Sequence, residues 1–168
     1  RAVISVCDSM NYLTDEEDLE YVFALVNNYL DPGGLFVFDM NTIHKYRDVI
    51  GDTTIAEDRE DGSFIWENSY DQEKNLNVYE LALFLPREDG LYEKCEEEHV
   101  QRAYSIETIK RMIEKAGMEL VAVYDAYTRN PGDENSERLT FIVREHGKSA
   151  ENDYHGIIPE RAEKKSEE

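Results

Sequence analysis

The sequence predicts an α/β protein built on a parallel sheet, and the first 42 residues carry that prediction. Two short apolar runs, at residues 2–7 and 35–39, indicate strands buried on both faces. A segment with helical periodicity, residues 14–30, lies between them. Strand, crossover helix and strand form a βαβ unit, which favours a doubly wound sheet.

The segment at 14–30 has the boundary signals of an amphipathic helix. Thr14 and Glu17 form a predicted capping box, and acidic residues in the first turn suit the positive end of the helix dipole. Apolar residues then recur on one face: Leu19, Val22, Phe23, Val26 and Leu30. The Pro-Gly-Gly sequence at 32–34 stops the helix and turns the chain into the second strand.

The middle of the chain changes its hydrophobic period to two. Residues 43–51 indicate a short helix, followed by an acidic loop that runs to residue 62. Residues 63–104 predict three strands in an antiparallel meander, with turns at 71–75 and 86–90. We expect this meander to be an insert with one face over something apolar.

The last part of the chain predicts a second helix and a closing hairpin. Ser105 is the expected helix cap and Gly117 the terminator, and two strands follow around a polar loop. The predicted organisation is a core from residues 1–42 and 105–146, an insert from 43–104, and a charged tail from 147–168.

Charge and composition limit the function classes. The net charge is −20, from 38 acidic and 18 basic residues, so nucleic acids and anionic membrane surfaces are disfavoured partners. A small molecule or a protein substrate remains. No run of apolar residues is long enough for a spanning helix. Cys7 and Cys95 have no motif spacing; Cys7 is expected to be a small buried hydrophobe, and a reducing cytoplasm fits.

Polar residues follow both predicted strands of the βαβ unit. They are Asp8, Ser9, Asn11 and Tyr12 after the first strand, and Asp39 and Asn41 at the end of the second. Open α/β sheets bind ligands at the carboxyl ends of their strands, so these side chains are candidate binding residues. The alternative is that they only form turns.

A second group of candidates lies on the meander. On an extended chain His99 and Gln101 share one face while Arg102 and Tyr104 share the other, so one pair should point beneath the insert. His99 is a candidate general base and Arg102 could bind a carboxylate. A solvated strand face explains both equally well. Trp66 is either core of the insert or a substrate platform. The acidic run before His99 predicts no metal site, since consecutive strand residues point to opposite faces.

The ordered motifs along the chain resemble a known family. They are Cys7-Asp8-Ser9-Met10-Asn11-Tyr12, Asp31-Pro32-Gly33-Gly34, Phe38-Asp39-Met40-Asn41, Ile65-Trp66-Glu67-Asn68 and Gln101-Arg102-Ala103-Tyr104-Ser105. Together they resemble the C-terminal part of a class I S-adenosylmethionine (SAM)-dependent methyltransferase, of the small bacterial type with a C-D-S-x-N-Y strand end.

The resemblance implies a fold, a cofactor and site residues. The chain would supply strands four to seven of a partial Rossmann-like sheet, the last antiparallel, with a three-stranded lid inserted after strand five. SAM would be the cofactor of the full-length protein, and the methyl acceptor a small-molecule or protein nucleophile. Implied cofactor-binding residues are Cys7, Asp8, Ser9 and Tyr12. Implied substrate-binding residues are Asn11, Asp39, Asn41, Trp66, Arg102 and Tyr104.

The chain departs from this family in one respect. It contains no G-x-G sequence, the feature that holds the cofactor after the first strand. We therefore expect more chain upstream, no SAM binding by these 168 residues alone, and no activity of the fragment. The edge of the strand at 2–7 should pair with a second copy or be covered by the tail. The alternative function is a non-catalytic binding or assembly module.

Overall fold

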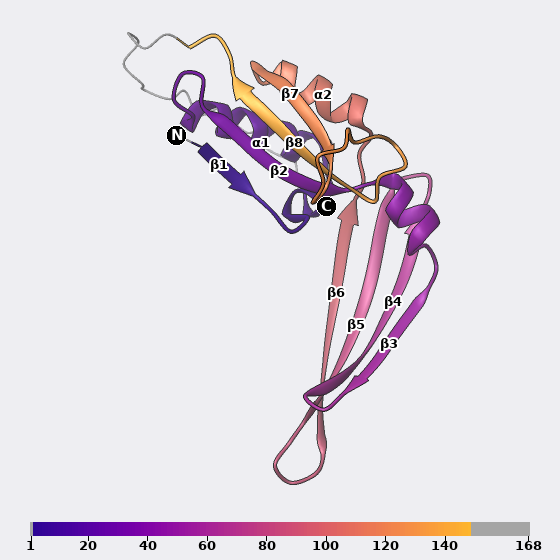
Figure 1. The fold of residues 1–168 in the computed structure, drawn as a ribbon. Coiled ribbons are helices and arrows are strands. Elements are labelled where there is room, and N and C mark those ends of the chain that lie inside the picture. The colour runs from indigo at the N-terminus through magenta and orange to yellow at the C-terminus, as the bar shows by residue number, and fades with distance from the viewer. Residues whose placement is uncertain (1, 149–168) are drawn as a thin grey trace, which may run out of the picture.

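A computed structural model describes residues 2–148 as an α/β body from which a long antiparallel sheet projects (Figure 1). In chain order the elements are strand β1 (Ala2–Ser5), 3₁₀-helix η1 (Ser9–Tyr12), helix α1 (Glu16–Tyr29), β2 (Leu35–Asn41), π-helix η2 (Lys45–Val49), β3 (Thr54–Arg59), β4 (Gly62–Asp71), β5 (Leu76–Pro86), β6 (Tyr92–Arg102), α2 (Ile106–Lys115), β7 (Met118–Asp125) and β8 (Arg138–Glu145). The charged tail predicted for 147–168 lies outside the described residues beyond residue 148.

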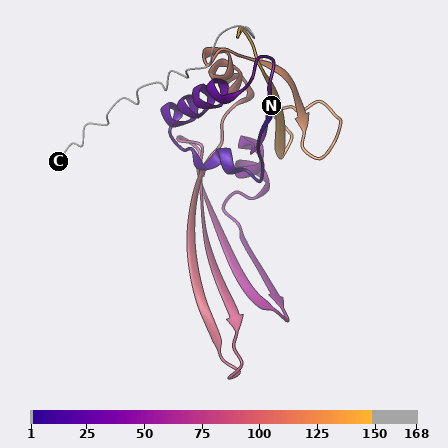
Figure 2. The same ribbon diagram turned by 90° about the vertical axis from the view of Figure 1, so that its left-hand side faces the viewer.

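The sheet of the body has the strand order β1-β2-β8-β7. β1 runs parallel to β2, with Ala2 opposite Leu35, which confirms the predicted βαβ unit. β8 runs antiparallel to both β2 and β7, so the predicted closing hairpin is confirmed. Both long helices lie on the same side of this sheet (Figure 2), where Lys115 of α2 pairs with Glu20 of α1.

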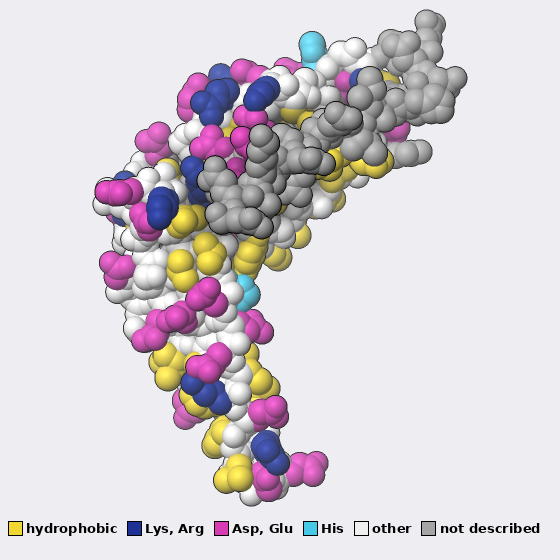
Figure 3. Space-filling view, turned by 180° about the vertical axis from the view of Figure 1, so that it is seen from behind, with side chains coloured by type: hydrophobic (Ala, Val, Ile, Leu, Met, Phe, Trp, Pro, Cys, Tyr) yellow, Lys and Arg dark blue, Asp and Glu magenta, His cyan; other side chains and the backbone are white. Residues whose placement is uncertain are grey.

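The projecting sheet has four strands, one more than the three predicted for the meander. Its order is β3-β4-β5-β6, and all neighbours are antiparallel. The segment expected to be an acidic loop contains β3, in which Ile55 lies opposite Trp66 while Glu57 and Asp58 are exposed. A charged edge strand is common because it resists pairing with other chains. Acidic and hydrophobic side chains share the surface of this sheet (Figure 3).

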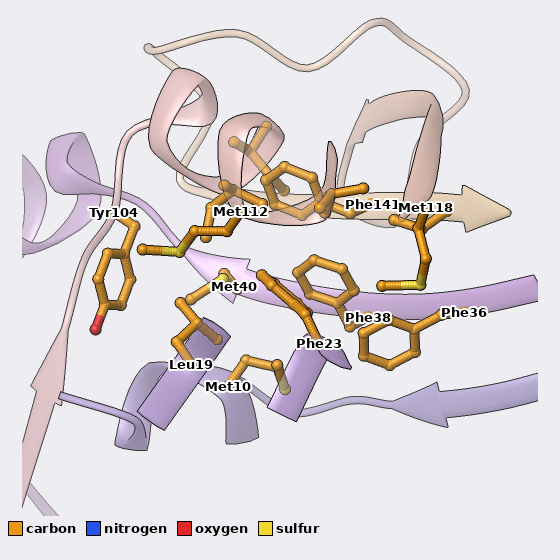
Figure 4. Packing of buried hydrophobic residues seen from close by; sticks show 14 of the residues in the cluster. Met10, Leu19, Phe23, Phe36, Phe38, Met40, Tyr104, Met112, Met118 and Phe141 are labelled. Atoms are coloured by element: carbon orange, nitrogen blue, oxygen red, sulfur yellow. The ribbon is translucent and has the colours of Figure 1, made fainter. Parts of the chain in front are cut away.

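One hydrophobic core fills the space between the body's sheet and its two helices (Figure 4). Its fully buried members include Leu19, Phe23, Leu30, Phe36, Phe38, Ile109, Met112, Ile113, Phe141 and Val143. Phe38 stacks on Phe36 and on Phe141, with ring centroids 4.7 and 4.9 Å apart. Burial of each such side chain contributes about 1.5–3 kcal/mol. Phe38 therefore joins β2 to β8 at the centre of the core.

The helix caps agree with the sequence for α2 and differ for α1. Ser105 accepts a hydrogen bond from the backbone N–H of Thr108, as predicted. The cap of α1 is Asp15, whose carboxylate accepts from the N–H of Glu17, and not Thr14. The N–H of Thr14 donates to the carbonyl of Tyr12, so Thr14 still belongs to the turn that ends η1.

Among residues 2–148 no helix combines the length and the apolar character needed to cross a membrane.

Candidate functional site

The chain leaves β1 through a left-handed turn that Asp39 holds from the neighbouring strand. Cys7 and Asp8 have φ angles of 61° and 49°. Both backbone N–H groups donate to the Asp39 carboxylate, at 3.2 Å from Cys7 and 2.7 Å from Asp8. The turn directs the Cys7 side chain outward, and the thiol is exposed, so the prediction of a buried Cys7 was wrong.

Asp8 is itself bound by two side chains from distant parts of the sequence. Its carboxylate accepts from Arg138, at the start of β8, and from Gln101, near the end of β6, both at 2.8 Å. Arg138 also lies 3.4 Å from Asp39. Burial alone would lower the pKa of the Arg138 guanidinium, but the adjacent Asp8 and Asp39 carboxylates outweigh burial and raise it.

The same chain of contacts continues into buried polar groups. Gln101 accepts a 2.5 Å hydrogen bond from the hydroxyl of Tyr46, which in turn accepts from the amide of Asn41 at 3.1 Å. Tyr46 lies on the π-helix and is fully buried, and that burial raises its pKa above the ordinary value. π-Helical turns are frequent at functional sites. We call Asp8, Asp39, Asn41, Tyr46, Gln101 and Arg138 the strand-end network.

Asn11 ties the strand-end network to the base of the projecting sheet. Its side chain is fully buried and accepts from the N–H of Asn41 at 2.9 Å. The Asn11 amide donates to the carbonyl oxygens of Asn41 and Arg102, at 3.1 and 2.9 Å. Asn11 therefore clamps the ends of β2 and β6 together.

His99 belongs to an aromatic group beside this network. The Tyr12 hydroxyl lies 2.8 Å from Nδ1 of His99, and Nε2 of His99 lies 3.1 Å from the Glu97 carboxylate. The ring of Tyr79 lies against His99, with centroids 5.2 Å apart, and Trp66 meets Tyr79 edge to face at 5.3 Å. We call these four rings and Glu97 the Tyr12 cluster.

The opposite face of β6 has a different role. Arg102 donates to the carbonyl of Thr14 and to the Glu16 carboxylate, both at 3.0 Å, and its guanidinium lies 5.0 Å from the Tyr104 ring centroid. The Tyr104 hydroxyl donates to the carbonyl of Leu13 at 2.5 Å. Burial raises the pKa of Tyr104 to about 12. These two side chains anchor the start of α1, while His99 and Gln101 are the pair that faces the strand ends.

The structure thus gathers most of the predicted site residues at one edge of the sheet. Asp8, Asn11, Asp39 and Asn41 are joined by hydrogen bonds, and Tyr12 reaches His99. Cys7 and Ser9 are exposed on the turn, where the Ser9 hydroxyl donates to the carbonyl of Val6. Trp66 lies partly buried in the projecting sheet, one ring removed from His99.

Two members of the strand-end network were not predicted, Tyr46 and Arg138. The position of Arg138 has a usable signal: β8 is antiparallel, so its first residue lies at the edge where β2 ends, opposite Asn41. When a strand is predicted to be antiparallel, an arginine at its first position is therefore a candidate neighbour of the carboxylates at the ends of the parallel strands. Tyr46 has no comparable signal, because its position depends on the π-helical turn.

Comparison with known proteins gives relatives of one kind, although no family model matches. The "Putative methyltransferase YqeM" of Bacillus subtilis (strain 168) is 31% identical over 140 residues, which is 83% of this chain and 56% of that protein. The "Putative methyltransferase GWCH70_2453" of Geobacillus sp. (strain WCH70) is 30% identical over 139 residues, again 56% of its length. Both relatives therefore carry the name "Putative methyltransferase". It spans about half of the length of those curated relatives.

Solved structures give the same fold. A SAM-dependent methyltransferase from Clostridium acetobutylicum is 29% identical, with a TM-score of 0.80 over 87% of this chain and 58% of that one. An amino pentose methyltransferase from Micromonospora echinaspora, solved with SAM bound, has a TM-score of 0.64 at 15% identity, over 85% of this chain and 57% of that one. The fold is therefore a mixed α/β methyltransferase-like fold with two sheets.

Proposed function

We propose that this chain is the C-terminal part of a SAM-dependent methyltransferase that acts on a small-molecule or protein nucleophile. In this assignment β1, β2, β7 and β8 are strands four, five, six and seven of the family's sheet. The sheet of β3–β6 is the lid inserted after strand five. The observation that carries the proposal is that the antiparallel β8 lies between the parallel β2 and its own hairpin partner β7.

The uncovered face of the body's sheet supports a longer protein. Side chains alternate along a strand, so Val37 points away from the helices while Phe36 and Phe38 point toward them. Ile4, Val37, Ile142 and Ala122 lie opposite one another in one apolar row across all four strands. Ile4 is 68% exposed. A doubly wound sheet carries helices on both faces, so this row is where the remaining part of the protein would pack.

The residues at the strand ends fit a methyl donor as one wall of its site. Asp8 already binds Arg138 and Gln101, so its carboxylate holds the turn in place. Cys7 and Ser9 are exposed on that turn and would lie against the donor. The face of the Tyr12 ring suits a sulfonium cation. When bound, SAM would supply a methyl carbon on positively charged sulfur, for which a neutral thioether is the leaving group.

The chain's own residues would orient the reactants and exclude water. Methyl transfer from a sulfonium is an in-line displacement, so correct placement provides much of the rate. The strand-end network fixes the turn at Asp8, and Asn11 fixes the end of the lid against it. The site is therefore rigid at the point where donor and acceptor would meet.

Cysteine alkylation in the presence of SAM tests this proposal with a built-in control. In the full-length gene product, SAM should slow alkylation of Cys7 by iodoacetamide, because the thiol lies on the proposed wall. Cys95 lies half-buried in the projecting sheet and should react at an unchanged rate. Calorimetry should find SAM binding by the full-length product and none by these 168 residues.

Three results would contradict the proposal. They are micromolar SAM binding by the 168-residue chain alone, equal alkylation of Cys7 with and without SAM, and no SAM binding by the full-length product. The last result would favour the non-catalytic binding or assembly module. A cytoplasmic location remains a prediction from the cysteine content.

A further inference from the structure

The hydrogen bonds around His99 determine which of its ring nitrogens carries the proton. The Glu97 carboxylate can only accept, so Nε2 of His99, 3.1 Å away, is the protonated nitrogen. In the neutral ring Nδ1 then holds a lone pair and accepts from the hydroxyl of Tyr12 at 2.8 Å. The phenol, imidazole and carboxylate form a chain in which each group donates to the next.

This chain of donors leaves Tyr12 as the group open to a ligand. Both ring nitrogens of His99 are engaged, so His99 itself offers no free nitrogen. The Tyr12 proton points at His99, and the Tyr79 hydroxyl occupies one lone pair of the Tyr12 oxygen. The second lone pair remains free to accept from another molecule. Tyr12 is 46% exposed, whereas the His99 side chain is 28% exposed. Tyr12 is also four residues beyond Asp8, at the strand-end edge proposed to face the methyl donor.

Aromatic packing holds the imidazole in place. The ring of Tyr79 lies at 33° to His99 and Tyr12 meets it edge to face, with centroids 5.8 Å apart. Burial, followed by a side-chain hydrogen bond with Tyr12, raises the pKa of Tyr79 above its ordinary value. Tyr79 therefore stays protonated and neutral, and the proton path is confined to Tyr12, His99 and Glu97.

We propose that Tyr12 accepts the proton of the methyl acceptor and passes its own proton to His99, so that the acceptor is an amine or a hydroxyl group. This inference rests on the proposed methyltransferase function. The acceptor's lone pair forms the new bond to the methyl carbon, and its N–H or O–H proton goes to the Tyr12 oxygen. The Tyr12 proton moves to Nδ1, and the resulting imidazolium is stabilised by Glu97. Tyr12 is then the catalytic residue, and His99 and Glu97 act through it.

The first test reads the tautomer of His99 and needs no substrate. Nitrogen-15 spectra of the full-length gene product, with His99 assigned through the H99N variant, should show a protonated Nε2 and an unprotonated Nδ1. Tyr12→Phe should change the Nδ1 signal, because it loses its hydrogen bond. Tyr92→Phe is the matched control, because Tyr92 lies on the same strand as His99, β6, and is 62% exposed. It should change neither signal.

The second test measures release of S-adenosylhomocysteine with benzylamine, benzyl alcohol and 2-mercaptoethanol as probe acceptors. Proton transfer by a positioned side chain contributes about 10²- to 10⁴-fold, so Tyr12→Phe should slow transfer to the amine and the alcohol by about that factor. Transfer to the thiol, which reacts as a thiolate, should be unaffected. Calorimetry should still detect SAM binding by Tyr12→Phe, because phenylalanine keeps the aromatic face proposed to contact the sulfonium. All properties of Tyr92→Phe should equal those of the unsubstituted protein.

The outcomes separate this inference from the proposed function. A protonated Nδ1, or equal amine transfer by Tyr12→Phe and the unsubstituted protein, overturns the role of Tyr12 and leaves the methyltransferase proposal standing. Methyl transfer to the thiol alone by a protein that binds SAM also overturns it. Failure of the unsubstituted protein to bind SAM contradicts the proposed function, and the catalytic role of Tyr12 falls with it.

Discussion

Asn11→Leu should destabilise the protein strongly although it keeps nearly the same side-chain volume. The Asn11 side chain is fully buried and makes three hydrogen bonds of 2.9–3.1 Å to backbone groups of Asn41 and Arg102. Leucine has no polar atoms, so one N–H and two carbonyl oxygens lose this partner. A buried polar group left unsatisfied costs about 1–3 kcal/mol. Carbonyl oxygens have a second lone pair, so we expect a total near the low end, about 3 kcal/mol.

Urea unfolding measures this loss with a convenient probe. The chain's single tryptophan, Trp66, lies in the projecting sheet, so its fluorescence reports that sheet while far-ultraviolet circular dichroism reports the whole chain. Asn28→Ala is the matched control, because the Asn28 side chain makes no hydrogen bond to a described residue; it should change stability by no more than about 0.5 kcal/mol. A loss below about 1 kcal/mol for Asn11→Leu would refute the view that Asn11 joins the two sheets.

Two further predictions concern the free strand edge and alkaline pH. In sedimentation, Ile4→Lys should reduce the dimer fraction of the 168-residue chain, because β1 pairs only with β2 among the described strands. Val49→Lys, a substitution at another exposed apolar residue, should leave the dimer fraction unchanged. A monomeric chain in which the edge of β1 is bare to solvent would contradict the prediction that this edge is paired or covered. Tyr104 has a pKa of about 12 in the folded state, against 10.0 for an exposed tyrosine, so the unfolded chain loses this proton first. The free energy of unfolding should therefore fall as pH rises from about 10 to 12, and it should fall less steeply in Tyr104→Phe. Identical urea midpoints of the unsubstituted protein at both ends of that range would contradict the raised pKa of Tyr104.

The parts of the fold that the sequence predicted are those with local signals. The βαβ unit follows from two apolar runs around a periodic helix, and the cap of α2 follows from Ser105. β3 was missed because four of its six residues are charged or threonine, and only pairing with β4 makes them a strand. The α1 cap moved by one residue because the preceding 3₁₀-helix takes up Thr14.

The sequence predicted the site residues whose position follows from the direction of the strands alone. It missed those whose position depends on strand register. Asp8 follows β1 and Asp39 lies near the end of the parallel strand β2, so the two had to meet at one edge of the sheet. Gln101 and His99 were expected to share a face, but only the twist and position of the projecting sheet bring that face to Asp8. Arg138 required the pairing of β8 with β2. The exposed Cys7 required knowledge of the left-handed turn.

The strand-end network explains how two carboxylates can lie together in a chain with a net charge of −20. Asp8 and Asp39 repel each other, and a buried charge without a partner is costly. Two backbone N–H groups and Arg138 compensate them, and Arg138 reaches both because β8 is antiparallel and begins where β2 ends. Since groups of the protein itself bind these carboxylates, the two side chains hold the turn in place. The groups at this edge that remain open to solvent are therefore Tyr12 and the outer side of the turn that Asp39 holds.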